Sequence, residues 1–347
     1  MKKYKVALIG TGRVAEHYLW LQKMQLTNFL EYLGCYDKSD SKSSEFSKRH
    51  GIVQYNSLSE LLAKESDFVL IATPSGTHFE IAMEVLKANK NVLIEKPACL
   101  RIEQIMELEN EANARKLICR SIFQNRFNMA VLQAKSMLES GLVGKVTSFS
   151  LRLIWSRNQE YYDDDWHGTW LLDGGVTSQQ AIHHIDCVNF LIGIPKKVHA
   201  YAQNSLNVLE AEDTLVSIVG IDPNILGTYQ FTTAARPCDM EASLMINGTK
   251  NSIRISGVAL NYLEVFNPVS KNWDRTVAEH VDSGYGTGHA KVFEYFFEGD
   301  AISTFPTMKD SKNAVMVVDA LYESYESGTE VYVERIKSKS KLGVRTP

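Results

Sequence analysis

Hydrophobic and polar positions divide this 347-residue chain into two parts with different patterns. In the first third, short apolar runs alternate with segments whose apolar residues recur at helical spacing. Runs such as 5–9 and 67–73 show little polar alternation, which is typical of strands buried on both faces. Strands separated by helices predict right-handed βαβ units around a parallel sheet. The strands expected here are 5–9, 31–37, 67–73, 91–95 and 117–123, and the helices 14–23, 57–64, 77–88 and 101–115.

From about residue 124 the pattern changes to a period of two, with turns at Asp222-Pro223-Asn224 and Asn247-Gly248. Such alternation predicts an antiparallel sheet. The strands expected in this part are 145–155, 197–204, 214–221, 226–233, 241–246, 262–266 and 331–333. The helices expected are 129–140, 177–191, 289–298 and 309–327, and Thr177 or Ser178 is expected to cap the second of these.

The predicted fold class is therefore α/β plus α+β. Residues 1–123 form a domain with a doubly wound parallel sheet, and residues 124–334 form a domain with an open, mostly antiparallel sheet. The helix at 309–327 is expected to pack back on the first domain. Residues 335–347 are a basic tail, expected to be a frayed and solvated end.

Composition excludes several classes of protein. A net charge of −4 leaves no overall basic field, so a general nucleic-acid binder is not expected. No apolar run approaches the ~20 residues of a membrane span. The five cysteines are odd in number and form no CxxC pair, which argues against a disulfide framework or a cysteine-rich zinc site. Free thiols predict a cytoplasmic location.

The first strand ends in Gly10-Thr11-Gly12-Arg13-Val14-Ala15, a G-x-G-x-x-A turn between strand and helix. The first glycine permits the tight turn, the second lets the backbone approach a pyrophosphate, and Ala15 lets the helix pack on the strand. The pyrophosphate would lie at the helix N-terminus, beside the backbone of Arg13 and Val14. The turn predicts a Rossmann dinucleotide site, with an ordinary glycine turn as the alternative.

Asp37 follows Ala15 by 22 residues, at the end of the second strand. That position suits a carboxylate accepting the adenosine ribose hydroxyls, and it favours NAD over NADP because a 2′-phosphate would meet a like charge. Lys38 and Lys42 nearby leave NADP as the second possibility.

Two further strand ends are expected at the same sheet edge, where open α/β sheets bind ligands. One carries Thr73, Pro74 and His78, and the other carries Glu95 and Lys96, before Pro97. All five residues are expected to contact the cofactor. The Lys96 ammonium could reach a substrate hydroxyl and the nicotinamide ribose. The alternative is an ordinary surface lysine.

The helix at 177–191 carries Gln179, His183 and Asp186 at spacings that put them on neighbouring parts of one face. A carboxylate near a histidine can set its ring orientation and basicity. The alternatives are a structural pair, His183 with His184, and a metal site of His183, Asp186 and Glu95. No HExxH or CxxC pattern supports a metal, so none is predicted.

The GxGxxA turn, the TPSGTH segment, the EKP tripeptide and the GG…HxxD helix together resemble the glucose–fructose oxidoreductase / inositol dehydrogenase (Gfo/Idh/MocA) family, over nearly the whole chain. The resemblance implies oxidation or reduction of sugars, inositols or sugar nucleotides with NAD(H) or NADP(H). It assigns Lys96 and His183 as catalytic residues. Gln179 stands where many members have aspartate, so it can orient a hydroxyl but cannot ion-pair with the histidine. Which of Lys96 and His183 transfers the proton stays open.

A narrower resemblance lies in 157–169, RNQEYYDDDWHGT, which looks like the branch of UDP-N-acetylglucosaminuronate 3-dehydrogenases of surface-polysaccharide synthesis. Arg157 could bind a carboxylate or phosphate, and Tyr161, Tyr162 and Trp166 could stack on sugar or base. The alternative is an acidic surface loop with anchoring aromatics, and the acids at 163–165 are expected to be solvated. Asn125 and Arg126 are also expected at the substrate.

The predicted function is an NAD-dependent dehydrogenase acting on a secondary hydroxyl of a UDP-linked amino sugar or uronate. An inositol or free-monosaccharide dehydrogenase is the first alternative, and a non-catalytic NAD-sensing regulator the second. One face of the antiparallel sheet is expected to need a partner, and the apolar alternation of Phe149, Leu151 and Leu153 favours this interpretation. The family resemblance implies a homodimer or homotetramer through that sheet.

Overall fold

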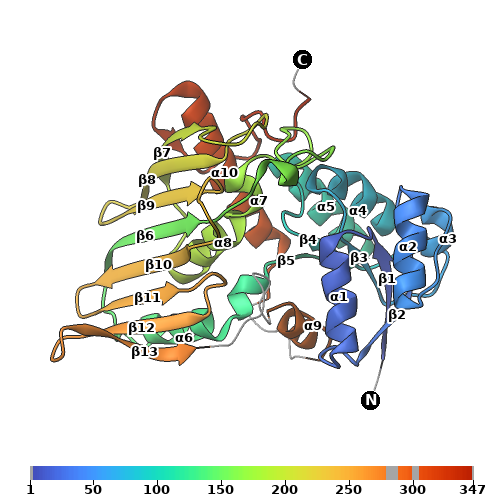
Figure 1. The fold of residues 1–347 in the computed structure, drawn as a ribbon, viewed down its shortest axis with the longest axis horizontal. Coiled ribbons are helices and arrows are strands. Elements are labelled where there is room, and N and C mark those ends of the chain that lie inside the picture. The colour runs from blue at the N-terminus through green and yellow to red at the C-terminus, as the bar shows by residue number, and fades with distance from the viewer. Residues whose placement is uncertain (1–2, 279–287, 299–304, 346–347) are drawn as a thin grey trace. The chain divides into compact units, whose positions relative to one another are not determined.

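The computed structural model describes residues 3–278, 288–298 and 305–345, and the chain divides into two compact units. The first unit comprises Met1–Cys99, Glu103–Ile122 and His289–Ser311. The second comprises Leu100–Ile102, Phe123–Gly288 and Lys312–Pro347. Each unit is built around one sheet (Figure 1).

The first unit contains a five-stranded sheet in the order β2-β1-β3-β4-β5, and every pair in it is parallel. This confirms the predicted doubly wound sheet. Because parallel strands end at one edge, the segments that follow β1, β2, β3 and β4 meet there. The strands are β1 (Tyr4–Ile9), β2 (Leu30–Tyr36), β3 (Phe68–Ile71), β4 (Val92–Glu95) and β5 (Cys119–Ile122). The helices between them are α1 (Arg13–Lys23), α2 (Asp40–His50), α3 (Leu58–Leu62), α4 (His78–Lys87) and α5 (Ile102–Arg115).

Helix α2 was not predicted from the sequence. It is strongly polar, and its buried residues are only Ser43 and Phe46, so it shows no apolar stripe. Only the residues at its two ends could have indicated a helix. The Ser39 side chain accepts a hydrogen bond from the Lys42 N–H, and Gly51 ends the helix with a φ of 67°. Both are ordinary helix-capping features.

Helix α9 (Gly288–Glu298) belongs to the first unit from His289 onward. Phe297 contacts the ring of Tyr4 at 4.6 Å and that of Phe68 at 5.1 Å, while Phe293 contacts Tyr18 at 5.2 Å. These aromatic contacts bind α9 to the sheet and to α1.

The prediction that the helix at 309–327 packs back on the first domain stays a prediction. Helix α10 (Met308–Ser327) clusters with the second unit from Lys312 onward. Its buried Tyr322 packs edge-on against Trp170 at 5.0 Å and accepts a hydrogen bond from the Gly175 N–H at 2.9 Å.

The second unit contains a nine-stranded sheet in the order β13-β12-β11-β10-β6-β9-β8-β7-β14. Only β6 and β9 pair in parallel, so the sheet is mostly antiparallel, as predicted. Strands β11 and β13 were not predicted. The strands are β6 (Val146–Ile154), β7 (Lys197–Gln203), β8 (Thr214–Asp222), β9 (Ile225–Thr232), β10 (Glu241–Gly248), β11 (Ser252–Ser256), β12 (Tyr262–Asn267), β13 (Asn272–Ala278) and β14 (Val331–Tyr332).

The two faces of this sheet differ in polarity and cover. Phe149, Leu151 and Leu153 are buried, on the face packed by helices, whereas Val216 and Ile218 of β8 are exposed on the other face. The apolar alternation of β6 thus serves the core, and it gives no support to a partner on the open face. The helices of this unit include α6 (Met129–Glu139), α7 (Val176–Gln179) and α8 (Ile182–Leu191).

The continuous helix predicted over 177–191 is interrupted. The Ala181 N–H donates to the carbonyl of Val176, five residues back, at 2.8 Å, and the regular pattern resumes as α8. This wider turn separates Gln179 on α7 from His183 on α8. The two residues therefore lie on two successive helices, and not on one continuous helix as predicted.

The part of the tail that the structure describes, 335–345, is packed against α10 and is not frayed as predicted. Arg335 pairs with Asp319 at 2.7 Å and with Glu323 at 2.5 Å, and the Ser340 N–H and hydroxyl also donate to Asp319. The Asp319 carboxylate is fully buried and requires such donors. The tail supplies them, which is why it is ordered.

All five cysteines are free thiols, as predicted. Over the described residues, no helix is both long and apolar enough to span a membrane.

Candidate functional site

The glycine turn after β1 is shaped by close packing at one glycine and by open space at the other. Gly10 has a φ of 94°, and a Cβ there would lie 2.3 Å from the carbonyl oxygen of Ala72. Only glycine allows the turn to pack on the end of β3. A Cβ on Gly12 would meet no atom within 4 Å, so the chain leaves room beside that backbone.

Helix α1 begins at this open turn with no side chain capping its N-terminus. Arg13 and Val14 form its first turn, and Ala15 is fully buried against the sheet. The helix dipole and the first N–H groups therefore face a space without a protein carboxylate or hydroxyl as cap, which suits an anion. These features fit the diphosphate of a dinucleotide.

Asp37 lies at the end of β2 and holds the glycine turn in place. One carboxylate oxygen accepts from both the N–H and the hydroxyl of Thr11 at 2.9 Å, and the other accepts from the Ser39 N–H at 2.9 Å. The acidic group thus sits directly beside the turn, as its spacing in the sequence predicts.

His78 is buried at the start of α4 and connects two strand-end segments. Its Nε2 lies 2.8 Å from the carbonyl oxygen of Thr73, and its Nδ1 lies 2.8 Å from that of Pro97. Burial lowers the pKa of His78, and the two carbonyl contacts oppose that shift. His78 therefore fastens the segment after β3, with Thr73 and Pro74, to the segment after β4.

Glu95 ends β4 with its carboxylate buried. It accepts a hydrogen bond from the hydroxyl of Tyr18, lies 3.3 Å from His289 Nε2, and accepts from the Lys96 N–H at 3.1 Å. The Lys96 side chain is half-buried. Sequence reasoning missed both Tyr18 and His289, since neither belongs to a motif and each lies far from Glu95 along the chain.

In the second unit, Arg126 forms a buried, bidentate ion pair with Asp186. Its Nε and Nη2 each donate to a different carboxylate oxygen at 2.6 Å, and both side chains are at least 96% buried. Both carboxylate oxygens of Asp186 are therefore bonded to Arg126. This ion pair was not predicted from the sequence. Asn125, from the same short helical segment (Gln124–Phe127), is also buried.

His183 lies on the first turn of α8, with 8% of its surface exposed, and its ring meets Phe123 edge-on at 5.9 Å. Gln179 ends α7 and is half-buried. Its neighbour Gln180 is buried and donates to the Tyr161 hydroxyl at 3.2 Å. This contact links the α7–α8 break to the segment at 157–169.

The N-terminus of α7 is held by Glu212, and not by Thr177 or Ser178 as predicted. The Val176 N–H donates to the Glu212 carbonyl and the Thr177 N–H to the Glu212 carboxylate, both at 2.9 Å. Tyr322 donates to the same carboxylate oxygen at 3.2 Å. Burial raises the pKa of Glu212 to about 7, although these hydrogen bonds oppose the shift.

The segment at 157–169 is built around aromatic rings. The Arg157 guanidinium lies 5.2 Å from the ring centre of Trp155 and 5.6 Å from that of Tyr161, and it pairs with Asp239 at 3.0 Å. Trp166 stacks close to His167, at 3.7 Å between ring centres. The acids at 163–165 are exposed, as predicted.

Tyr162 differs from its neighbours in this segment. It is buried, and its hydroxyl bonds to that of Thr233 at 2.7 Å. Its ring belongs to the core of the second unit, so Tyr161 and Trp166 are the better candidates for stacking on a ligand.

We call Arg157, Tyr161 and Trp166 the Arg157 cluster. Beside it, two buried polar atoms have no hydrogen-bond partner within the described structure: Trp155 Nε1 and Gln180 Oε1. Such groups are costly when left unpaired. A polar ligand that accepts from the indole and donates to the amide would satisfy both.

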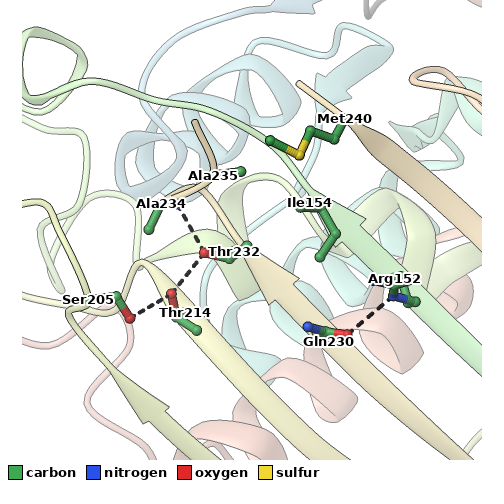
Figure 2. A pocket seen from close by; sticks show the side chains of 9 residues that line it. All are labelled: Arg152, Ile154, Ser205, Thr214, Gln230, Thr232, Ala234, Ala235 and Met240. Carbon is green, nitrogen blue, oxygen red and sulfur yellow. Dashed lines mark hydrogen bonds between the residues drawn. The ribbon is translucent and has the colours of Figure 1, made fainter. Parts of the chain in front are cut away.

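A shallow hollow of about 450 Å³ lies on the open face of the sheet in the second unit (Figure 2), and two residues of its lining, Thr232 and Ala235, form backbone hydrogen bonds with Trp155. Its lining includes Arg152, Thr214, Gln230 and Thr232, which are joined in part by the hydrogen bonds that Figure 2 shows. None of the predicted site residues lines it. Within the described ranges, no group of three or more His, Cys, Asp or Glu side chains could hold a metal ion.

Residues 4–123 match a family described as an oxidoreductase family with an NAD-binding Rossmann fold, and residues 131–254 match the GFO/IDH/MocA C-terminal domain. An uncharacterised oxidoreductase of Synechocystis sp. is 31% identical over 61% of this chain, and the match spans 61% of that relative. D-glucoside 3-dehydrogenase of Escherichia coli is 22% identical over 94% of this chain and 97% of its own.

A crystal structure of the WlbA dehydrogenase from Bordetella pertussis, in complex with NADH and UDP-GlcNAcA, is similar in fold with a TM-score of 0.85. It is 26% identical, and the match covers 96% of this chain and 99% of that one.

Proposed function

The chain belongs to the GFO/IDH/MocA family of oxidoreductases, and on that premise we propose that it is an NAD-dependent dehydrogenase of a UDP-linked amino sugar or uronate. The reaction proposed is transfer of a hydride from a secondary sugar hydroxyl carbon, as in a 3-dehydrogenase, leaving a ketosugar. The observation that carries the substrate class is the Arg157 cluster beside the α7–α8 break.

The cluster offers what a sugar nucleotide needs. Arg157 is a cation suited to a carboxylate or phosphate, and Tyr161 and Trp166 provide ring faces for a sugar or base. Trp155 and Gln180 add one donor and one acceptor that the described chain does not use. The similarity to the WlbA dehydrogenase, solved with UDP-GlcNAcA, supports the same class.

The residues of the first unit fit a dinucleotide. We propose that the backbone at Gly12 and the first turn of α1 take the diphosphate, and that Asp37 accepts the ribose hydroxyls. A carboxylate in that position favours NAD over NADP. The bound nicotinamide supplies the hydride acceptor, or the donor in the reverse direction.

Side chains of the protein remove the proton of the substrate hydroxyl. We propose that Lys96 and His183 both act in this step, so that one accepts the hydroxyl proton and the other stabilises the developing alkoxide. Gln179 orients the hydroxyl by hydrogen bonding and carries no charge. The division between Lys96 and His183 is left to the variants described below.

A free sugar or glycoside is the second candidate substrate class, and one observation favours it. Arg157 already pairs with Asp239 at 3.0 Å, so its charge is partly balanced without an anionic ligand. The similarity to D-glucoside 3-dehydrogenase points the same way.

Inhibition by UDP and the variant Arg157→Gln distinguish the two candidates. For a UDP-sugar enzyme, UDP competes with substrate, and Arg157→Gln raises KM about 10- to 100-fold, because a charged hydrogen bond is lost. Arg152→Gln is the matched control, since Arg152 also pairs with an acid, Glu241, but lies on the open sheet face. Absence of UDP inhibition, with turnover of a free glycoside, would overturn the first candidate.

We also propose that the chain forms a homo-oligomer through the open face of the nine-stranded sheet. Four apolar residues on that face are exposed in the single chain: Tyr201, Val216, Ile218 and Leu226. A second copy of the same face would cover them.

A further inference from the structure

We propose that Glu95, His289 and Tyr18 form a buried clasp that positions Lys96, so that Glu95 and His289 act on the reaction through the lysine. The clasp rests on the proposed hydride-transfer function. It assigns Glu95 a positioning role, in place of the cofactor contact expected from the EKP tripeptide. It also gives a role to His289, a residue outside every motif.

The clasp joins three elements of the first unit. Tyr18 comes from α1, Glu95 from the end of β4, and His289 from the first turn of α9. The Tyr18 hydroxyl donates to Glu95 Oε1, and His289 Nε2 lies 3.3 Å from the same oxygen. The His289 and Tyr18 rings also meet edge-on at 5.5 Å.

The remaining carboxylate oxygen is directed to the lysine. Glu95 Oε2 accepts from the backbone N–H of Lys96 at 3.1 Å, so it fixes the peptide from which the lysine side chain leaves. On the other side of Lys96, the Pro97 carbonyl is held by His78 at 2.8 Å. Both oxygens of Glu95 are thus engaged within the protein, and the backbone is held on both sides of Lys96.

The clasp is buried, so the charge of the Glu95 carboxylate is poorly screened by water and acts strongly on neighbouring groups. Glu95 is 5% exposed and His289 is 1% exposed. Burial alone would raise the pKa of Glu95, but His289, the Tyr18 hydroxyl and the charge of Lys96 outweigh it, and the pKa is lowered. Glu95 is therefore an anion in the working range of pH.

The other titratable groups that face Glu95 supply no positive charge beside its carboxylate. His17, on α1 beside Tyr18, has its pKa lowered to about 3 by burial and by His289, so it is neutral. His78, on α4, has its pKa lowered by burial. Lys96 is thus the cation that balances the carboxylate, and a buried anion favours the charged form of a neighbouring ammonium.

The first test measures the lysine without any substrate. In the full-length protein with ¹³C-dimethylated lysines, the NMR signal of Lys96 is assigned by its loss in Lys96→Arg and titrated with pH. Glu95→Gln should lower the midpoint of the Lys96 titration by about one pH unit, as expected on removing a close opposite charge. An unchanged midpoint in Glu95→Gln would overturn the clasp, whether or not the protein turns over any substrate.

The second test uses turnover. Glu95→Gln and His289→Gln should each lower kcat about 10- to 100-fold while the Kd for NAD stays within about threefold of wild type. The double variant should be little worse than either single one, because the residues act as a unit. Tyr18→Phe should have a smaller effect in the same direction, and it keeps the ring that packs on α9.

The control is His50→Gln, which removes the contact of a half-buried histidine with Glu16 in the same unit. Loss of NAD binding in Glu95→Gln, with kcat unchanged at saturating NAD, would overturn the positioning role in favour of a cofactor contact. A wild type that turns over no sugar would contradict the proposed function, and the Lys96 titration would still decide the clasp.

Discussion

Buried or half-buried carboxylates fix other groups at several points of the predicted site. Asp37 holds the backbone N–H of Thr11 in the glycine turn, Glu95 holds the backbone N–H of Lys96, and Asp186 holds the Arg126 side chain. The orientation of each carboxylate is fixed by its hydrogen-bond donors. A sequence motif gives the position of the carboxylate along the chain, but it does not identify these donors. A substitution at such a residue therefore changes the placement of the group that it holds, as well as charge.

Asp37 offers the simplest prediction at this scale. Asp37→Ala should weaken NAD binding about 10- to 100-fold, since it removes a charged acceptor and loosens Thr11. The same change should raise the affinity for NADP relative to NAD, because a 2′-phosphate no longer meets a like charge. Fluorescence titration with both reduced cofactors measures this. Glu31→Ala, at the exposed start of β2, is the control for net charge, and NAD affinity equal to wild type in Asp37→Ala would refute the ribose role.

At the scale of elements, the interrupted helix pair α7–α8 depends on a buried acid for its start. Glu212 supplies both a carbonyl and a carboxylate to the first N–H groups of α7. Tyr322 of α10 reaches the same carboxylate, so the position of α7 depends on an element far away in the sequence.

Glu212 also predicts a dependence of stability on pH. Its pKa is about 7 in the folded chain, against an ordinary value of 4.5. Below pH 4.5 the group is protonated in both folded and unfolded chains. Between these values only the folded chain retains the proton, so stability falls as pH rises, by about 3 kcal/mol at pH 7 and above.

Urea unfolding of wild type and Glu212→Gln from pH 4 to pH 8 tests this dependence. The stability of wild type relative to Glu212→Gln should fall by about 3 kcal/mol over the range, because glutamine does not ionise. The neighbouring, exposed Glu210→Gln should show no such trend against wild type. A constant difference between wild type and Glu212→Gln would contradict the account.

The elements that sequence could predict are those with strong local patterns. The apolar strands of the first unit and the alternating strands of the second repeat at their own periods, so their bounds are predictable to within a few residues. Helix α2 was missed because Phe46 is its only large buried residue, and β13 because most of its residues are exposed. The partners of Glu95 and the placement of α10 depend on contacts between distant segments, which no local pattern encodes.

At the scale of the whole molecule, the two units carry different parts of the proposed chemistry. The first holds the glycine turn, Asp37 and Lys96, and the second holds His183 and the Arg157 cluster. The second also has a sheet with one covered face and one open face. The open face is where we propose that a second copy of the chain binds.

Changing that face should alter the assembly. Ile218→Asp places a charge among exposed apolar residues of β8, so it should reduce the particle mass in light scattering to that of one 39.1 kDa chain. Val269→Asp is the matched control, since Val269 is more exposed still but lies in the turn between β12 and β13. A wild type that already measures as a single chain would contradict the proposed oligomer.

The central claim is hydride transfer assisted by Lys96, and one measurement tests it most directly. Purified wild type and Lys96→Ala are incubated with NAD and a panel of UDP-sugars, UDP-uronates, inositols and free sugars, and NADH formation is followed by absorbance. The account predicts turnover with a UDP-linked amino sugar or uronate. It also predicts a loss of about 10²- to 10⁴-fold in Lys96→Ala, with NAD binding retained. Equal turnover by wild type and Lys96→Ala would contradict it.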